Sequence, residues 1–182
     1  MPGIKEVKEV EKVETNGNGV HHPKIKSIVL TSTGSGSDYS NLQQKEEDYP
    51  KLDPNREDQV IVRIKAVGLN FAELMQRQGL YKPTTKTPYT PGYEGSGLVE
   101  EVGSQVTDLK ANDRVLVFNS SGIWKEVVIV PRSNVIKLPD NMSFEDAAGL
   151  VVNYLTAYQI LFRMTNIKPG NKILIHMAAG KF

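Results

Sequence analysis

The stretch Lys172-Ile-Leu-Ile-His-Met-Ala-Ala-Gly180 decides how the rest of this chain is interpreted. It follows the turn pair Pro169-Gly170, and its apolar residues 173–175 are typical of the opening of a buried parallel strand. The small residues at its end are typical of a strand-to-helix turn where backbone approaches a phosphate group. Only Lys181 and Phe182 follow, without the glycines and the helix to which such a turn leads. The pattern therefore predicts the front part of a dinucleotide-dependent enzyme.

The composition is that of a globular protein with little net charge. Hydrophobic residues make up 39% of the 182 residues and the formal net charge is +1, so no preference for nucleic acid or acidic membranes is implied. The absence of cysteine excludes disulfides, thiolate zinc sites and cysteine nucleophiles. The amino terminus is rich in Lys and Glu, and no apolar run approaches the roughly 20 residues of a membrane span. We therefore expect a soluble, cytoplasmic protein.

The order of patterns predicts three regions. Residues 1–24 have few apolar groups, which favours a disordered tail over one narrow helical stripe. Residues 25–142 contain short apolar runs separated by turn residues, and this spacing predicts a small β-barrel-like domain. In residues 143–182, Ser143-Phe-Glu-Asp146 resembles a capping box that opens a helical stretch reaching about Met164, before the strand at 173–175. The expected fold class is mainly β, with an α/β remnant at the end.

Within the β region the expected elements are short. The expected strands are 25–30, 59–68, 98–102, 114–118 and 124–130. A short helix is expected at 70–78, and the polar segment 39–58 is expected to lack regular structure because of its prolines. The glycines of Gly92-Tyr-Glu-Gly-Ser-Gly97 predict close backbone approach or positive φ.

Four segments carry a resemblance to a known family. They are Gly68-Leu-Asn-Phe-Ala-Glu-Leu-Met-Gln-Arg-Gln-Gly-Leu-Tyr81, Pro91-Gly-Tyr-Glu-Gly-Ser-Gly-Leu-Val-Glu-Glu-Val-Gly103, Asn153-Tyr-Leu-Thr-Ala-Tyr158 and His176-Met-Ala-Ala-Gly180. In this order they resemble the medium-chain dehydrogenase/reductase superfamily in its zinc-free quinone-oxidoreductase branch. Within that branch the sequence most resembles the synaptic vesicle membrane protein (vesicle amine transport protein) homologues, over residues 25–180.

The resemblance implies a two-domain protein of which this chain holds the first part. A GroES-like domain would occupy 25–142, and 143–182 would be the linker helices and first strand of an incomplete Rossmann domain. Family members bind NADPH between the two domains and reduce quinones or enones. A homodimer is implied for the full-length family. We expect the truncated chain to be inactive and to bind no cofactor tightly, and the choice of NADPH over NADH rests on the family alone.

Zinc-dependent relatives carry a cysteine and a histidine ligand at the positions of Asn70 and Tyr93. Neither residue is a usual zinc ligand, so we expect no metal site. An adjacent pair such as His21 and His22 is more often chance than a metal site, and His176 is expected to be a structural residue of a buried strand. Glu94 is expected to brace the glycine turn through hydrogen bonds.

Without zinc, a carbonyl must be polarised by hydrogen-bond donors. The resemblance places Asn70 and Tyr81 in the active-site cleft beside the substrate and the nicotinamide, as the expected catalytic residues. The alternative is that Asn70 only caps the short helix and Tyr81 packs in its loop. Met75 stands where several quinone reductases have tyrosine, which implies a more apolar pocket here.

The resemblance also supplies cofactor-binding candidates. Thr156 would face the nicotinamide carboxamide, with Asn153 and Asn70 as further contacts, and Gly180 matches the first glycine of the phosphate turn. The alternative for Thr156 is an interior helix residue whose hydroxyl bonds back to a backbone carbonyl. Lys181 departs from the glycine that the family pattern expects next.

A second function hypothesis differs in class. The barrel could be a non-enzymatic binding module at a vesicle or organelle surface, as the resemblance to vesicle proteins suggests. No basic amphipathic helix in the sequence supports direct membrane insertion, so any association is expected to be peripheral. Nucleotide binding by the complete protein would favour the enzyme, and partner capture without nucleotide would favour the module.

Overall fold

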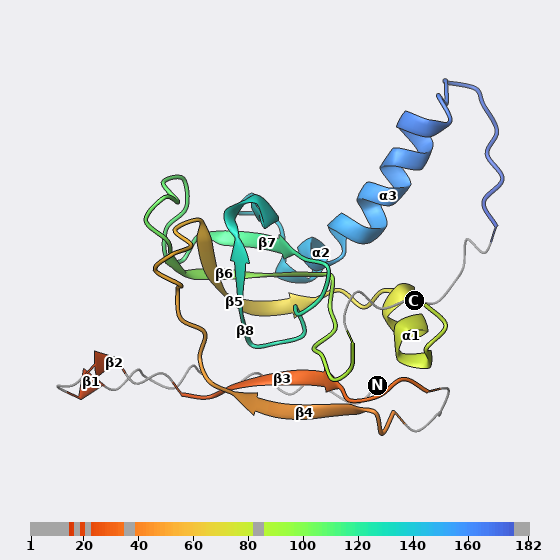
Figure 1. Ribbon diagram of the computed structural model, residues 1–182. Coiled ribbons are helices and arrows are strands. Elements are labelled where there is room, and N and C mark those ends of the chain that lie inside the picture. The colour runs from red at the N-terminus through yellow and green to blue at the C-terminus, as the bar shows by residue number, and fades with distance from the viewer. Residues whose placement is uncertain (1–14, 17–18, 21–22, 35–38, 82–85, 177–182) are drawn as a thin grey trace, which may run out of the picture.

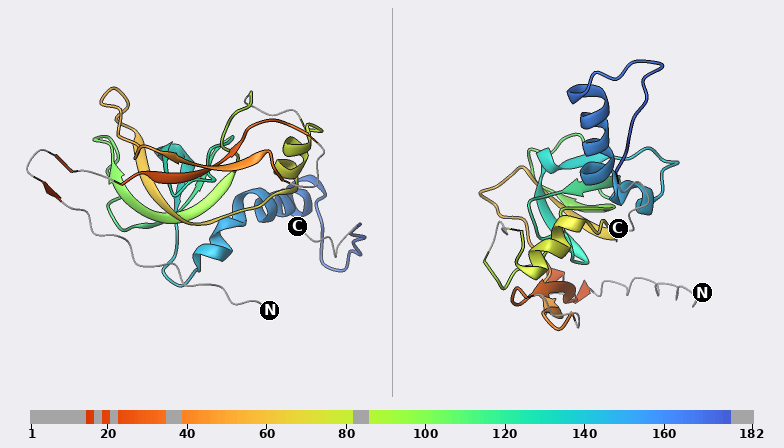
Figure 2. Two further views of the ribbon diagram at one scale, coloured as in Figure 1. Left: turned by 90° about the horizontal axis from the view of Figure 1, so that it is seen from below. Right: turned by 90° about the vertical axis from the view of Figure 1, so that its right-hand side faces the viewer.

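A five-stranded antiparallel sheet forms the centre of the computed structural model, which describes residues 15–16, 19–20, 23–34, 39–81 and 86–176 (Figure 1). Its strand order is β8-β5-β6-β7-β9. The strands are β5 (Gln59–Val67), β6 (Glu94–Val102), β7 (Arg114–Phe118), β8 (Val127–Pro131) and β9 (Val135–Lys137). The left view of Figure 2 shows these strands curving strongly. The prediction of a mainly β chain is therefore confirmed.

The core explains why these segments pair. Val60 and Val62 of β5 pack with Val99, Val115 and Val117 of the neighbouring strands, and all five side chains are almost fully buried. β-branched side chains fit this half-covered pleated surface well. Ile61, on the opposite face of β5, is also fully buried. Ile61 is covered there by Ile25 and Val127, with which it forms a second hydrophobic cluster.

A separate hairpin supplies that cover. It consists of β3 (Ile25–Leu30) and β4 (Leu42–Glu47), paired antiparallel. The backbone N–H of Ile28 donates to the carbonyl of Trp124 at 2.9 Å, which ties the hairpin to the segment before β8. The expectation that 39–58 lacks regular structure is wrong for β4. That strand is polar and mostly exposed, so it has no apolar alternation by which a sequence pattern could find it.

The predicted start of one strand needs correction, whereas the predictions for its glycines hold. β6 begins at Glu94 rather than residue 98, because its glycines lie within the strand. A Cβ added at Gly97 would lie 2.0 Å from the carbonyl oxygen of Arg63, so the predicted close backbone approach is present there. Gly92, just before the strand, has φ of +106°, as the glycine pattern also predicted.

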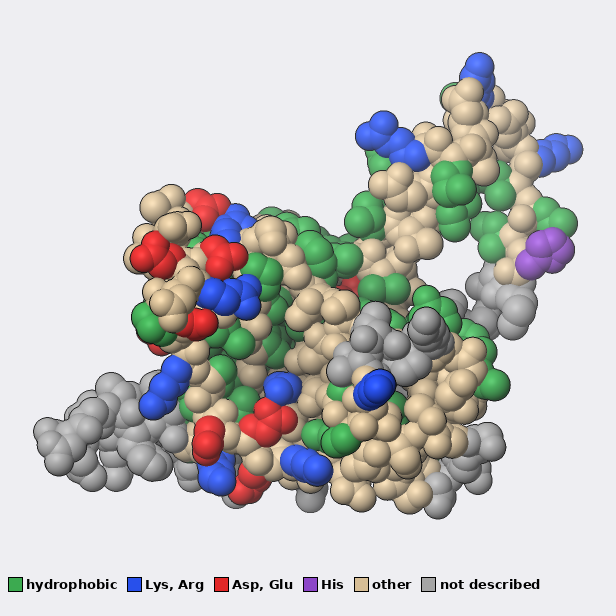
Figure 3. Space-filling model, in the orientation of Figure 1, with side chains coloured by type: hydrophobic (Ala, Val, Ile, Leu, Met, Phe, Trp, Pro, Cys, Tyr) green, Lys and Arg blue, Asp and Glu red, His purple; other side chains and the backbone are tan. Residues whose placement is uncertain are grey.

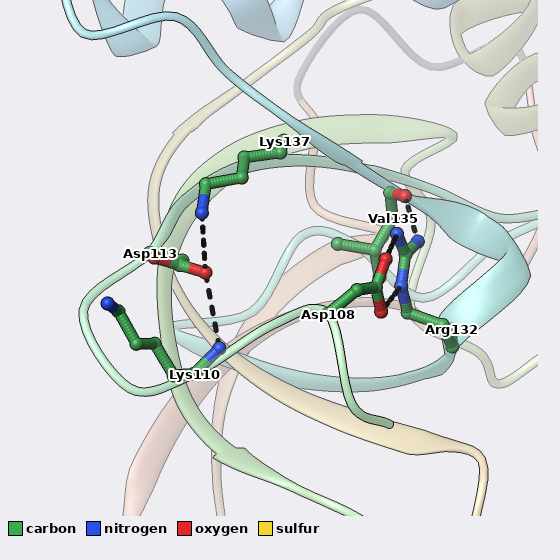
Figure 4. Close-up of polar contacts among 6 residues, drawn as sticks. All are labelled: Asp108, Lys110, Asp113, Arg132, Val135 and Lys137. Carbon is green, nitrogen blue, oxygen red and sulfur yellow. Dashed lines mark hydrogen bonds and ion pairs between the residues drawn. The ribbon is translucent and has the colours of Figure 1, made fainter. Parts of the chain in front are cut away.

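Ion pairs fasten the loop between β6 and β7 to the short 3₁₀ turn Arg132–Asn134 and β9 (Figure 4). Arg132 donates to both carboxylate oxygens of Asp108, at 2.9 and 2.5 Å, and to the carbonyl of Val135. Lys137 donates to Asp113 at 3.0 Å. These cations hold the pKa of Asp108 and that of Asp113 below their usual values.

The helical end of the chain begins as predicted. The Oγ of Ser143 accepts from the backbone N–H of Asp146 at 3.0 Å and caps α2 (Phe144–Ala148). Gly149 separates α2 from residues 150–164, here called the linking helix, which consists of α3 (Leu155–Tyr158) between two π-helical turns, Leu150–Tyr154 and Gln159–Met164. Ala147, Leu150 and Val151 pack near Leu116 of the sheet.

The linking helix then projects away from the sheet (Figure 1), and apolar side chains along it are visible in Figure 3. Tyr154, Phe162 and Met164 are 69%, 58% and 78% exposed. The strand predicted at 173–175 is not formed, and these residues are irregular and exposed. A parallel strand needs neighbouring strands for its backbone groups, and no described segment pairs with this one. His176 is accordingly exposed rather than buried in a strand.

At the amino end, Thr15–Asn16 (β1) and Gly19–Val20 (β2) pair antiparallel. The rest of the predicted tail up to residue 22, including His21 and His22, lies outside the described residues. The domain boundaries proposed from the sequence stay a prediction.

Candidate functional site

Asn70 stands where β5 gives way to α1 (Phe71–Gln78). Its backbone is extended, at φ −108° and ψ 149°, and it is the N-cap residue of α1. Its N–H donates to Oε2 of Glu73 at 2.7 Å, which is half of a capping box, and Gly79 ends the helix with φ of +77°. The cap therefore uses the backbone of Asn70, and the side-chain amide is free for other contacts.

The side chain of Asn70 is 4% exposed and lies between two partners. Its Nδ2 donates to Oε1 of Glu94 at 3.2 Å, and its Oδ1 accepts from Nδ2 of Asn153 at 2.9 Å. Two residues expected from the family resemblance, Asn70 and Asn153, are thus brought into contact from the sheet and the linking helix.

Glu94 is the residue that joins these two parts of the fold. It is fully buried, and its Oε2 accepts from the backbone N–H groups of Val151 and Val152, at 2.8 and 2.9 Å. A Cβ added at Gly68 would lie 2.7 Å from the Glu94 side chain and 2.6 Å from the carbonyl oxygen of Ala148. The sheet and the start of the linking helix therefore meet at a close-packed junction, and Glu94 braces the helix rather than the glycine turn.

A second buried carboxylate lies beside this junction. Glu73 is 4% exposed, and besides the N–H of Asn70 it accepts from the N–H of Tyr93 at 2.9 Å. Burial raises the pKa of Glu73 to about 7, and the nearby charge of Glu94 adds to the rise, while the two backbone hydrogen bonds oppose it. The carboxylate therefore titrates near neutral pH.

Tyr93 is the residue that the family resemblance matches to a histidine ligand of zinc-dependent relatives. Its hydroxyl accepts from Nε2 of Gln76 at 2.6 Å, and Oε1 of Gln76 accepts from the hydroxyl of Tyr89 at 3.3 Å. Burial, followed by the proximity of Tyr81, raises the pKa of Tyr93. No group of three potential metal-ligating His, Cys, Asp or Glu side chains occurs among the described residues.

Comparison with known proteins supports this architecture. Residues 56–140 match the alcohol dehydrogenase GroES-like domain. The synaptic vesicle membrane protein VAT-1 homolog of Rattus norvegicus is 49% identical over 158 residues, which are 87% of this chain and 38% of that protein. The crystal structure of the human VAT-1 homolog-like protein superposes with a TM-score of 0.72 at 37% identity, over 80% of this chain and 44% of that one.

A third relative carries a cofactor. Escherichia coli quinone oxidoreductase, solved in complex with NADPH, superposes with a TM-score of 0.66 at 32% identity, over 79% of this chain and 42% of that one. These comparisons support the resemblance of the chain to the medium-chain dehydrogenase/reductase superfamily. Among the members of that superfamily, the chain is similar to the VAT-1 homologues and the quinone oxidoreductases, and it spans about two fifths of the length of these relatives.

Two other residues expected from the family resemblance, Tyr81 and Thr156, lie in the described part of the chain. Tyr81 follows α1 and is 51% exposed, so it is not packed in its loop. Thr156 is exposed on the linking helix, one turn after Asn153, and its hydroxyl makes no hydrogen bond to a backbone carbonyl within the described part of the chain. An amide and a hydroxyl on one helix face suit the carboxamide of a nicotinamide. Gly180 lies outside the described residues.

Sequence reasoning missed several members of this junction. The backbone amides of Val151 and Val152 carry no signal in a side-chain pattern. Glu73 could have been found, because Asn70-x-x-Glu73 has the spacing of a capping box. Gln76 could not, because a glutamine in a short polar helix is more often exposed.

Proposed function

We propose that this chain forms the substrate-side part of a zinc-independent, NADPH-dependent oxidoreductase that reduces quinones or enones. The observation that carries the proposal is the hydrogen bond between Asn70 and Asn153, reinforced by Glu94. It gathers side-chain amides from the sheet and the linking helix at one junction. The NADPH in the Escherichia coli relative supports the choice of cofactor.

The residues present fit one end of such a cofactor. Asn153 and Thr156 can hold a nicotinamide carboxamide, which accepts through its carbonyl and donates through its amide nitrogen. When bound, NADPH would supply a hydride. The described residues offer no glycine-rich turn at a helix start for the pyrophosphate, and the chain spans about two fifths of its relatives. The 182-residue chain alone is therefore proposed to be inactive.

The acceptor would be polarised by two donors of this chain. The Asn70 amide nitrogen has two hydrogens, and one is used by Glu94, which leaves one to donate to a carbonyl oxygen. The half-exposed hydroxyl of Tyr81 is the second donor. Donors already held in place stabilise the negative charge that develops on a reduced carbonyl oxygen.

A chimera tests the proposal. The chain would be joined at Gly180 to the remainder of the quinone oxidoreductase of Pseudomonas syringae pv. tomato, whose structure superposes with a TM-score of 0.67 at 37% identity. We expect the chimera to oxidise NADPH in the presence of a quinone, while the 182-residue chain shows neither turnover nor tight NADPH binding. A folded chimera that binds NADPH yet reduces neither a quinone nor an enone would contradict the proposal.

The non-enzymatic module remains the second candidate, because several relatives are named as synaptic vesicle membrane proteins. In the described part of the chain, no helix has the length and apolar character needed to cross a bilayer. Peripheral association with vesicles, a cytoplasmic location and a homodimer of the longer protein are likewise proposals. Vesicle capture by a chimera without enzymatic activity would favour the module.

A further inference from the structure

Glu94 makes contacts that go beyond bracing. Among the described residues, every hydrogen bond of its carboxylate comes from an N–H donor: the side chain of Asn70 and the backbones of Val151 and Val152. A carboxylate can only accept, whereas the amide of Asn70 can be turned either way at little cost in shape. The carboxylate therefore decides which end of the Asn70 amide faces it.

The orientation of the Asn70 amide in turn determines the orientation of the Asn153 amide. With Nδ2 of Asn70 turned to Glu94, its Oδ1 faces the linking helix and can only accept, so Asn153 must present Nδ2. The three side chains thus form a directional chain of hydrogen bonds. Burial strengthens the effect at the contact between Glu94 and Asn70, because Glu94 is fully buried and Asn70 nearly so, whereas Asn153 at the end of the chain of hydrogen bonds is exposed.

We infer that Glu94 is a positioning residue that fixes the direction of the Asn70 and Asn153 amides and, through Val151 and Val152, the start of the linking helix against the sheet. This inference rests on the proposed function for its catalytic meaning. Asn70 keeps one N–H for an acceptor only while Glu94 holds its amide in this direction. Asn153 then turns its Oδ1 away from Asn70, toward the side where a nicotinamide carboxamide could donate to it.

Gly68 supports the assignment independently. A side chain at this position would overlap both Glu94 and the carbonyl oxygen of Ala148, so the backbone leaves room for the carboxylate to reach the helix. The backbone of Gly68 lies closer to Glu94 and Ala148 than ordinary packing requires, since real Cβ atoms essentially never come within 3.0 Å of such neighbours.

The test uses the 182-residue chain and needs no cofactor. Glu94→Gln keeps the shape and one carbonyl oxygen for Val151 and Val152, but its NH₂ group would meet the Nδ2 of Asn70. We expect both asparagine amides to turn over, which NMR would detect as displaced side-chain amide signals of Asn70 and of Asn153. Glu94→Ala should make the backbone amides of Val151 and Val152 exchange with solvent about tenfold faster, because they lose their acceptor.

A double variant separates the effect of hydrogen-bond direction from the effect of side-chain packing. Glu94→Gln with Asn70→Asp exchanges carboxylate and amide, so the glutamine NH₂ can donate to Asp and Asn153 can again donate through Nδ2. We expect the Asn153 side-chain signals to return to their wild-type positions, an effect that loss of packing alone would not produce. The control is Glu101→Gln, the same substitution at an exposed position of β6, which should leave every signal in place.

Two outcomes would overturn the inference. One is that Glu94→Gln leaves the Asn153 side-chain signals unchanged, and the other is that Glu94→Ala leaves the exchange of Val151 and Val152 unchanged. Failure of the proposed function would look different, since it would give an inactive chimera while these signals behave as expected.

Discussion

The side chain of Asn153 donates a hydrogen bond to that of Asn70, 83 positions earlier in the sequence, over 2.9 Å. One residue caps a helix at the end of a sheet strand, and the other lies on the linking helix. The contact exists because Glu94 binds both parts, with its carboxylate accepting from the Asn70 amide and from the first turn of that helix. The proposed acceptor and nicotinamide contacts therefore depend on one buried junction.

Gly68→Ala should destabilise the protein. The added Cβ would lie 2.6 Å from the carbonyl oxygen of Ala148 and 2.7 Å from Glu94, and neither neighbour is free to withdraw. Overpacking of this kind costs about 2 kcal/mol, which urea unfolding would show as a lower midpoint with an unchanged slope. Gly34→Ala is the matched control, because a Cβ there meets nothing within 4 Å. Equal midpoints for the two variants would contradict the close packing.

The stability of the protein should depend on the protonation of Glu73. Its folded pKa is raised from 4.5 to about 7, so the folded state binds this proton more tightly than the unfolded state does. This contribution to the free energy of unfolding is full below pH 4.5 and is lost as pH rises through about 7. The Glu73→Gln variant has no titratable group at this position, so its free energy of unfolding should lack this dependence on pH.

The measurement is the difference in melting temperature between wild type and Glu73→Gln across this pH range. The wild type should lose stability relative to the variant as pH rises. Glu145→Gln, at an exposed helix position, should follow the wild type. A difference that stays constant with pH would show that Glu73 does not titrate there.

The exposed apolar side of the linking helix should promote self-association of the 182-residue chain. Leu155 and Phe162 are 49% and 58% exposed, and Tyr158 packs its ring against that of Phe162 with centroids 5.1 Å apart. Leu155→Gln with Phe162→Gln should lower both the apparent mass in light scattering and the binding of a hydrophobic dye. Ile136→Gln removes a comparably exposed apolar side chain from β9 and should change neither. If Ile136→Gln matches the double variant, the helix is not the associating surface.

Zinc should not co-purify with the protein in stoichiometric amount. The family resemblance matches Asn70 and Tyr93 to the ligand positions of zinc-dependent relatives, and their side chains are engaged with Glu94 and with Gln76. Elemental analysis of untagged protein should find well under one zinc per chain. One full equivalent that survives dialysis would refute this expectation.

The sequence predicted the elements whose own residues define them. The apolar runs of β5 and β7, the short helix α1 and the cap of Ser143 were all readable locally. β4 was missed because its residues pair through backbone and carry no apolar pattern. The strand at 173–175 was predicted from an apolar run that finds no strand beside it in the described structure.

The site was predictable only where the family resemblance named residues. Asn70 and Asn153 were expected near the nicotinamide, but their contact depends on a tertiary approach that no local pattern encodes. The role of Glu94 toward Val151 and Val152 was hidden for the same reason, because the donors are backbone groups. The effect of Glu94 on the pKa of Glu73 also requires the fold.

The turnover number for quinone reduction by the NADPH-dependent chimera, measured with Asn70→Ala and separately with Tyr81→Phe, tests the central claim most directly. Each variant removes one proposed donor to the acceptor oxygen, and we expect each to lower kcat by about 10²-fold while the melting temperature of Tyr81→Phe stays unchanged. Wild-type kcat in both variants would contradict the account, because the acceptor would then be polarised by groups other than Asn70 and Tyr81.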